Sequence, residues 1–442
     1  MQAPKRDEHL YQIDLVRLVT FGGVILDHVI LGVAAATAVA AGGVGLLLRY
    51  TRYSFFALTG FVLTYQYRHR EMQPVQFWRR RYKLIGLPFL SWSLFYWCYG
   101  RYRPGGFDAL RDCFDSASAA WESLKSITYD LITGSAWYHL YFLSVSMQIY
   151  AIFPALLWVL RKTWGYHRYL LVASGAFQAW VMYAMLRPPL PFFTHGVAHE
   201  IWTHMVITLI PYQFFVLAGC VAAMHFEAFQ AFMVRWRWPI IVIGLATIAG
   251  TLVYYTWDVR RGTSIMRASN VFMLHNAFAF IAIIAILYCI GTIWQTRRTK
   301  GSVADGFMRS AADRSFAIYL AHALALAELL PIIQNHDDAP LWPLIIFFYI
   351  LTCLLTVFFV EVLRRSPFSL ITTGRSAIDH REQNPLASGA VSVAAVTLGL
   401  VLRGVYEAMV GDTIVAFGVL LAISAIVVAV KQRADRESFA IA

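Results

Sequence analysis

Charged side chains are scarce in this sequence. Asp, Glu, Lys and Arg make up 14% of its 442 residues, whereas hydrophobic residues make up 59%. Because soluble domains normally carry about 25% charged residues, this composition argues against a soluble globular protein and favours a polytopic membrane protein. The formal net charge of +12 is carried by basic residues that lie between apolar segments. We therefore interpret these residues as signals of orientation in a membrane and expect no binding to nucleic acid.

Cysteine is also rare, and the pattern of a cleavable signal peptide is missing. None of the five cysteines forms a CxxC pair, and most lie in apolar segments. This distribution is typical of small buried side chains, so we expect neither a disulfide framework nor a metal site. The first dozen residues are polar and are followed by an apolar run long enough to span a membrane, which we expect to be retained.

Long apolar segments are abundant and predict an all-α polytopic membrane protein. Most Lys and Arg residues fall in alternate connecting segments, which predicts that both termini lie in the cytoplasm. We expect the protein to be a multi-pass protein of the plasma membrane. No repeat relates the first six segments to the last six, which counts against a secondary transporter built from two similar halves. The twelve expected spans are about 13–37, 44–66, 84–101, 137–160, 169–187, 204–224, 238–256, 271–294, 314–333, 341–363, 387–404 and 411–430.

The first expected span carries Asp14, Arg17 and His28. In an α-helix the eleven steps from Arg17 to His28 bring both side chains onto one face, about 16 Å apart along the axis. Ionisable residues inside a membrane helix are costly, so a functional role is the default hypothesis. Alternatively, Arg17 reaches the lipid headgroups and His28 bonds to a neighbouring helix. Asp14 and Arg17 are three residues apart and are expected to pair.

A basic segment precedes the third expected span and contains Arg79, Arg80, Arg81 and Lys83. Arginine side chains match the oxygens of phosphate, so this cluster predicts a phosphate-binding site at the cytoplasmic surface. A signal that sets membrane orientation and contacts anionic lipid is the alternative.

Two further groups of polar residues lie in or beside expected spans. Trp137 and His139 begin the fourth span in an aromatic run that either forms an interfacial belt or stacks on a sugar ring. Tyr319, His322 and Glu328 lie in the ninth span. A carboxylate at the depth of Glu328 is expensive unless it is paired or wetted, and the 600° between residues 322 and 328 places these two side chains roughly opposite on the helix.

Six blocks resemble, in the same order, the motifs of the acyltransferase 3 family of integral membrane O-acyltransferases. The composition, the short polar loops and the aromatic motifs also look like those of actinobacterial members of the family, some of which act on envelope glycans and trehalose mycolates. Three positions depart from the family pattern: Thr59 replaces Ser, Tyr141 replaces Trp, and Leu84 stands where many members have a second Arg. The blocks are Ile13–Arg17 with His28, Phe55–Phe61, Phe77–Pro88, Trp137–Pro154, Pro211–Gly219 and Ser315–His322.

The resemblance implies about ten transmembrane helices, and the last two expected spans go beyond that number. We therefore divide the chain into a cytoplasmic N-terminal segment, an acyltransferase 3-like domain, a cytoplasmic linker, an additional helix pair and a cytoplasmic tail. The expected bounds of these parts are 1–12, 13–365, 366–386, 387–430 and 431–442.

The resemblance further implies an acetyl-CoA-dependent O-acetyltransferase with no permanently bound cofactor. Acetyl-CoA would be the donor, and the acceptor a hydroxyl of an envelope glycan or glycolipid outside the cytoplasm. We expect His28 to act as general base, although an acyl-His28 intermediate is an alternative.

The other predicted site residues have supporting roles. Arg17, with Asp14 beside it, would hold the donor together with Arg79, Arg80, Arg81 and Lys83. Trp137, His139, Tyr319, His322 and Glu328 are candidates for acceptor binding, proton relay or orientation of His28.

Two other classes of protein remain open at this point. Intramembrane His and Glu residues also suit a transporter or flippase for a lipid-linked sugar, with Glu328 as the proton-coupling site. A scaffold in an envelope-synthesis complex is the third class, but it leaves Arg17 and His28 unexplained.

Overall fold

The computed structural model describes residues 9–334, 340–406 and 409–441. Within these ranges all regular elements are helices, which confirms the expected all-α class. The helices form two compact units. Unit 1 comprises residues 1–81 and 100–315, and unit 2 comprises residues 82–99 and 316–442.

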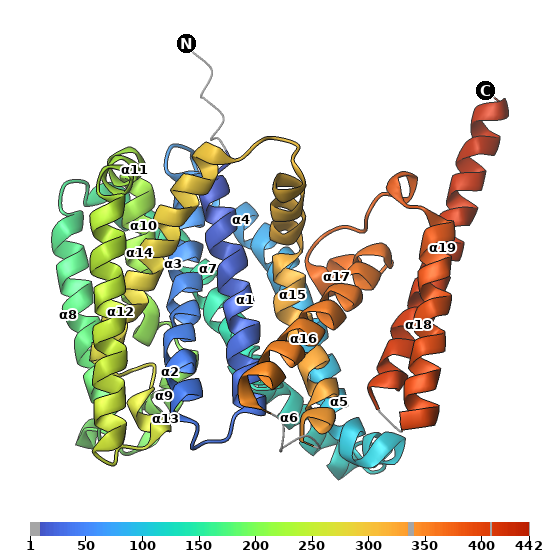
Figure 1. Cartoon of the computed structure of the whole chain (residues 1–442), viewed down its shortest axis with the longest axis horizontal. Coiled ribbons are helices and arrows are strands. Elements are labelled where there is room, and N and C mark those ends of the chain that lie inside the picture. The colour runs from blue at the N-terminus through green and yellow to red at the C-terminus, as the bar shows by residue number, and fades with distance from the viewer. Residues whose placement is uncertain (1–8, 335–339, 407–408, 442) are drawn as a thin grey trace. The chain divides into compact units, whose positions relative to one another are not determined.

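Unit 1 is built around three long helices that contact one another, two from the start of its sequence and one from near its end. They are α1 (Tyr11–Val33), α3 (Tyr50–Tyr67) and α14 (Leu274–Arg297), and Figure 1 shows them side by side. Around them lie α2 (Val39–Leu48), α4 (Pro74–Arg81), α6 (Ala117–Thr133), α7 (Tyr141–Lys162), α8 (His167–Met185), η2 (Pro191–Phe193), α9 (Gly196–Thr203), η3 (Met205–Ile207), η4 (Ile210–Tyr212), α10 (Gln213–Met224), α11 (Phe226–Arg235), α12 (Arg237–Arg260) and α13 (Ile265–Ala268).

Two glycines allow α3 and α10 to approach closely. A Cβ at Gly60 would lie 2.3 Å from the carbonyl oxygen of Val216, and a Cβ at Gly219 would lie 2.0 Å from that of Ala57. Small residues at helix contacts are a general feature of membrane bundles, because they let backbones pack without an intervening side chain. This contact fixes α3, and with it the polar residues that α3 carries.

Unit 2 joins the remaining helices. It contains the π-helical turn η1 (Tyr82–Gly86), the first half of α5 (Leu87–Asp112), most of α15 (Val303–Gln334), α16 (Leu341–Arg365), α17 (Ser369–Thr373), η5 (His380–Glu382), α18 (Pro385–Tyr406) and α19 (Val410–Ile441). The hydroxyl of Tyr96 donates to the carbonyl of Leu320 at 2.8 Å, and Trp92 Nε1 donates to the carbonyl of Thr372 at 2.8 Å. These bonds tie α5 to α15 and α17.

Eight helices in the described residues are long and apolar enough to cross a membrane. A ninth span arises if α10 and α11, which meet at 96°, are taken as one broken span together with η4. Four of the twelve expected spans correspond instead to α3, α5, α8 and α10. Three of them, α3, α8 and α10, have 18, 19 and 12 residues and are shorter than each of the eight, which have 21 residues or more. The fourth, α5, has 26 residues but is interrupted by the non-helical backbone of Gly106.

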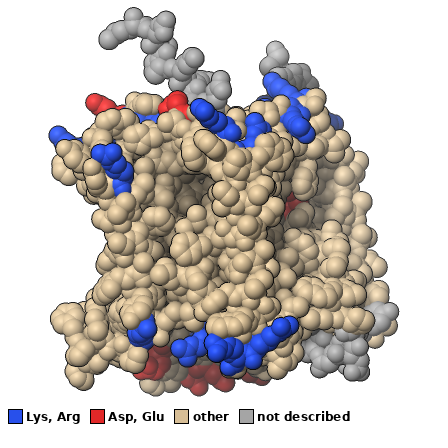
Figure 2. Space-filling model, turned by 60° about the vertical axis from the view of Figure 1, so that its left-hand side comes forward, with Lys and Arg blue, Asp and Glu red and all other residues tan. Residues whose placement is uncertain are grey.

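Charged side chains follow the distribution expected of a membrane protein. On the face drawn in Figure 2, nearly all visible Lys, Arg, Asp and Glu side chains lie along two opposite edges, and uncharged residues fill the band between them. This pattern agrees with apolar helices that cross a hydrocarbon layer and end in water.

Candidate functional site

The helix α1 carries three of the predicted site residues without interruption. Asp14 lies in its first turn, where the helix dipole favours a negative charge. Its side chain is buried and contacts His9 Nε2 at 2.5 Å. Arg17 follows one turn later, and His28 lies eleven residues further along the same helix. Asp14 is therefore held in place by a histidine that the sequence did not single out.

A pocket of about 340 Å³ opens at the N-terminal end of α1, and we call it the Arg17 pocket. Polar side chains from α1 and α3 converge there. The residues that line it are His9, Leu10, Ile13, Asp14, Arg17, Phe61, Val62, Tyr65, Gln66 and Arg70. Two arginines and one buried carboxylate thus face a single space of a size that is common for ligand sites.

Among the basic residues that precede the third expected span, Arg81 is joined to this pocket. Its Nη2 donates to Gln66 Oε1 at 2.7 Å, and Gln66 lines the pocket. The guanidinium lies 5.7 Å from the ring centre of Phe77 and 6.0 Å from that of Tyr150, which fixes its orientation. Arg79 and Arg80, by contrast, are exposed on α4.

The rim of the Arg17 pocket is stabilised by a further arginine. Arg161 at the end of α7 donates through Nη2 to the carbonyls of Tyr67, at 2.7 Å, and Arg70, at 2.6 Å. These bonds cap the end of α3 and hold the backbone that bears Arg70. The pocket is thus built from α1, α3 and the residues that follow α3, with support from α7.

At the other end of α1, the half-buried ring of His28 packs against Tyr138, with 4.7 Å between ring centroids. The chain reaches Tyr138 because Gly134, with a φ of +74°, ends α6 in the left-handed conformation that glycine adopts readily. Trp137 is half-buried and His139 is buried beside it. The prediction named Trp137 and His139 from this aromatic run, but the residue in contact with His28 is the one between them.

A second polar cluster near His28 was missed from the sequence. We call Asp27, Arg49, Arg52, Tyr141 and Tyr212 the Arg52 cluster. Arg52 lies over the ring of Tyr141, 5.3 Å from its centre, and interacts electrostatically with Tyr212. Asp27 interacts electrostatically with both Arg49 and Arg52. The sequence did contain a signal for this cluster: Arg49 and Arg52 lie inside the expected span 44–66. Charged residues within membrane spans are rare outside functional sites.

The predicted residues of α15 belong to unit 2. His322 is fully buried, and its Nδ1 lies 2.6 Å from the carbonyl oxygen of Tyr319, so Nδ1 carries the proton that is donated. Glu328 is buried and accepts hydrogen bonds from Tyr99 and Thr413 hydroxyls, each at 2.8 Å. The expected pairing of this costly carboxylate is thus provided by hydroxyl groups, one of them from α19.

The predicted site is divided between the two units. Unit 1 holds Asp14, Arg17, His28, Arg79, Arg80, Arg81, Trp137 and His139, and unit 2 holds Lys83, Tyr319, His322 and Glu328. Lys83 is exposed in η1. The candidate role of His322 in orienting His28 therefore stays a prediction. Among the described residues, no group of three or more His, Cys, Asp or Glu side chains is arranged to hold a metal ion.

The sequence model of the acyltransferase 3 family, described as an acyltransferase domain, matches residues 10–361. Neither the curated proteins nor the solved structures gave a match. The matched range contains the Arg17 pocket, His28, the Arg52 cluster and Glu328, and it ends before the linker that leads to α18.

Proposed function

The chain belongs to the acyltransferase 3 family, and we propose that it transfers an acetyl group from acetyl-CoA to a hydroxyl group outside the cytoplasm. The acceptor would be a cell-envelope glycan or glycolipid, of which a trehalose mycolate is one candidate. Membrane acyltransferase activity follows from the family; the donor, the acceptor and the residue roles below are our proposal.

The observation that carries this proposal is the Arg17 pocket. Coenzyme A bears several phosphate groups, and guanidinium groups bind phosphate oxygens through charge-assisted, bidentate hydrogen bonds. Arg17 and Arg70 line the pocket, and Arg81 is bonded to its wall through Gln66. Asp14, which contacts His9, adds a buried carboxylate to the same lining.

In this proposal, His28 would receive the acyl end of a donor held in this pocket. The eleven helical steps from Arg17 to His28 correspond to about 16 Å of helix, a distance that the extended arm of coenzyme A would bridge along α1. As the acceptor hydroxyl attacks the thioester carbonyl, the His28 imidazole would take the hydroxyl proton, and the coenzyme A thiolate would leave. Contact with Tyr138 limits the orientations of the imidazole ring.

The Arg52 cluster and the aromatic run would serve the acceptor side. Attack on the thioester places negative charge on the carbonyl oxygen, and a fixed guanidinium such as Arg52 stabilises charge of that sign. Trp137 and Tyr138 present rings on which a sugar would stack. In unit 2, Tyr319, His322 and Glu328 are candidates for binding the acceptor or relaying the proton, as is His139 in unit 1.

The test is acetyl transfer by the purified full chain, with acetyl-CoA as donor and an envelope lipid extract as acceptor. We expect H28A to lose transfer by a factor of about 10² to 10⁴, the usual contribution of general acid–base catalysis. It should retain coenzyme A binding, measured as a thermal shift. H275A is the matched control, because His275 is also a partly buried histidine of unit 1, in contact with Tyr254. Full activity of H28A, or no coenzyme A binding by the wild type, would contradict the proposal; the latter would favour the flippase class.

A further inference from the structure

A second polar cavity lies in unit 2, beyond the end of the family match. It has a volume of about 600 Å³ and is formed by the end of α16, the loop at 377–383 and one face of α19. We call it the α19 pocket. Because the acyltransferase domain ends at residue 361, the loop and α19 lie outside the part of the chain that the family accounts for.

Three cations line the α19 pocket: Arg365, Arg381 and Lys431. Arg381 uses Nε to contact Asp435 at 3.1 Å, and Arg365 contacts Glu361 through Nη1. A guanidinium has five N–H donors in a fixed fork, so each of these contacts leaves donors on the same group. Lys431 forms no ion pair within the described part of the chain and is exposed.

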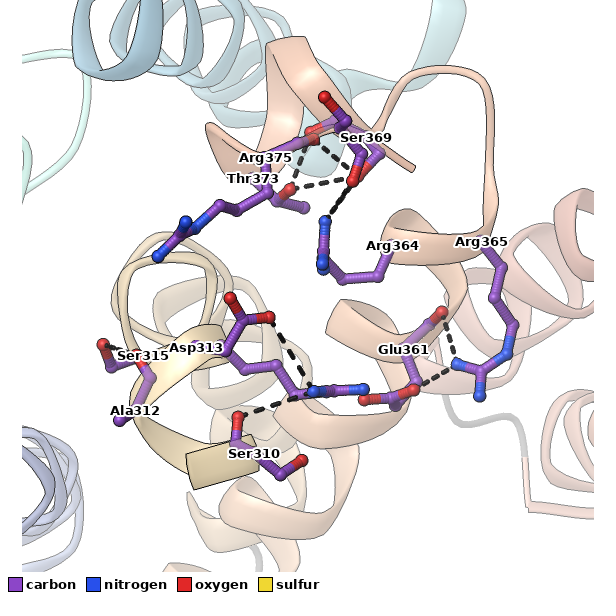
Figure 3. Close-up of polar contacts among 12 residues, drawn as sticks. Ser310, Ala312, Asp313, Ser315, Glu361, Arg364, Arg365, Ser369, Thr373 and Arg375 are labelled. Atoms are coloured by element: carbon purple, nitrogen blue, oxygen red, sulfur yellow. Dashed lines mark hydrogen bonds and ion pairs between the residues drawn. The ribbon is translucent and has the colours of Figure 1, made fainter. Parts of the chain in front are cut away.

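Neighbouring arginines at the end of α16 have different roles, and Figure 3 shows their side chains diverging. Arg364 points to α17, where its Nη1 donates to Ser369 Oγ at 3.3 Å and to the carbonyl of Ser376. Arg365 turns away toward Glu361. Arg364 therefore closes the turn after α16, whereas Arg365 is available to the pocket.

The loop that carries Arg381 is fixed to α19. Gln432 Nε2 donates to the carbonyls of His380, at 2.6 Å, and Gln383, at 2.9 Å. The His380 ring lies between two carboxylates, with Nδ1 3.2 Å from Asp379 Oδ1 and Nε2 3.0 Å from Asp435 Oδ2. The cationic side of the pocket is thus organised before any ligand binds, which lowers the entropic cost of binding.

Part of the pocket lining is apolar and continues onto exposed apolar residues of α19. Val427 lines the pocket and is 42% exposed. Ile423 and Val430, four residues before and three after it, lie on the same face of the helix and are also exposed. Exposed apolar residues on a candidate membrane span are expected to contact lipid chains. A ligand of the α19 pocket therefore meets cations and also an apolar surface at Val427, one helical turn from Lys431.

We propose that the α19 pocket binds the phosphate headgroup of an anionic membrane lipid. Basic pockets between transmembrane helices on the cytoplasmic side are a general means of holding lipid phosphates. The phosphate would accept hydrogen bonds from Arg365, Arg381 and Lys431, and one acyl chain would lie along Val427. This site is independent of the donor and acceptor sites proposed above, so either proposal can fail alone.

The test measures binding of dioctanoyl-phosphatidylglycerol to the delipidated full chain by thermophoresis, with dioctanoyl-phosphatidylcholine and sodium phosphate at equal ionic strength as comparison ligands. We expect phosphatidylglycerol to bind best. The double variant R381Q/K431Q should bind it about fivefold more weakly for each cation removed. The matched control is R433Q/R436Q, which removes the same charge from exposed positions of α19 outside the pocket.

Each other outcome has a defined meaning. Equal binding of the two lipids, or equal loss in the pocket and control variants, would overturn the proposal. Binding of sodium phosphate as tight as that of phosphatidylglycerol would replace the lipid with a soluble anion and also overturn it. If the double variant does not fold, K431Q alone decides, because Lys431 has no ion-pair partner to lose among the described residues.

Discussion

At the scale of single residues, the structure distinguishes among basic side chains that the sequence presented as one cluster. Arg17 lines a pocket and Arg81 is bonded to its wall, whereas Arg79 and Arg80 are exposed. The sequence placed all of these arginines near the expected cytoplasmic surface, but it could not say which face of α4 is turned toward α3. That choice depends on the contact between Arg81 and Gln66, which are fifteen residues apart.

This distinction predicts unequal effects on donor affinity. Loss of a charge-assisted hydrogen bond costs about 1.5–3 kcal/mol, so we expect R17A to raise the dissociation constant of coenzyme A by about 10- to 100-fold. R79A should change it by less than about twofold, because an exposed charge is screened by salt. Isothermal titration with both variants measures the difference. Equal affinities for R17A and the wild type would remove Arg17 from the donor site.

Arg52 gives a second prediction at this scale. Its planar guanidinium lies over the Tyr141 ring and interacts with Tyr212, a geometry that the ammonium of lysine cannot reproduce. If Arg52 stabilises charge in the transition state, R52K should lower kcat by about 10²- to 10³-fold with little change in coenzyme A affinity. Steady-state kinetics and titration separate the two effects. A change confined to KM for the donor would assign Arg52 to binding instead.

At the scale of elements, the close contact of α3 and α10 makes a prediction about stability. A methyl group at Gly219 would overlap the carbonyl of Ala57, so we expect G219A to push the helices apart and destabilise the protein by about 1–3 kcal/mol. G250A is the matched control, because Gly250 of α12 has no neighbouring atom within 4 Å and alanine is the better helix former by about 1 kcal/mol. Thermal unfolding in detergent should show a lower midpoint for G219A only.

The contact between α15 and α19 makes a second prediction about stability. Thr413 donates to the buried carboxylate of Glu328, so T413V removes one of its hydrogen bonds and should cost about 1.5–3 kcal/mol. T413S keeps the hydroxyl and should be nearly as stable as the wild type. If T413V and T413S unfold at the same temperature, the hydrogen bond does not stabilise the helix pair. The same comparison tests whether the C-terminal helices support a residue of the acyltransferase domain.

These elements also show what the sequence could and could not predict. Long apolar runs were sufficient to predict most helices. A segment that crosses lipid must satisfy its backbone hydrogen bonds internally, and an α-helix does so. They did not predict that α10 and α11 meet at 96°, since the bend depends on packing around them. Likewise, spacing placed Arg17 and His28 on one helix, but the contacts of His28 with Tyr138 and of Arg52 with Tyr141 join residues far apart in the chain.

At the scale of the whole molecule, each compact unit combines segments that are separate along the chain, and the predicted site residues are divided between the two units. The units divide the chain at 81, 99 and 315, so residues 82–99 of α5 belong with the C-terminal helices. A boundary near residue 365, expected from the number of apolar segments, separates α16 from α18 in sequence, although α16 and α19 are in contact within unit 2. Counting spans cannot reveal such a grouping, because it depends on pairs of helices that are distant along the chain.

Orientation in the membrane is the property of the whole molecule on which the proposed reaction depends. In the proposed reaction coenzyme A is supplied from the cytoplasm, so the Arg17 pocket at the start of α1 would have to open there. The excess of Lys and Arg in alternate segments predicts this orientation and a cytoplasmic C-terminus. We expect a green fluorescent protein fused after residue 442 to fluoresce and alkaline phosphatase at the same position to be inactive. The same reporters inserted between α8 and α9, in the segment 188–195 expected outside, should give the opposite result and serve as the control. Phosphatase activity at the C-terminus would reverse the predicted side of that end, and activity at an N-terminal fusion would place the Arg17 pocket away from its donor.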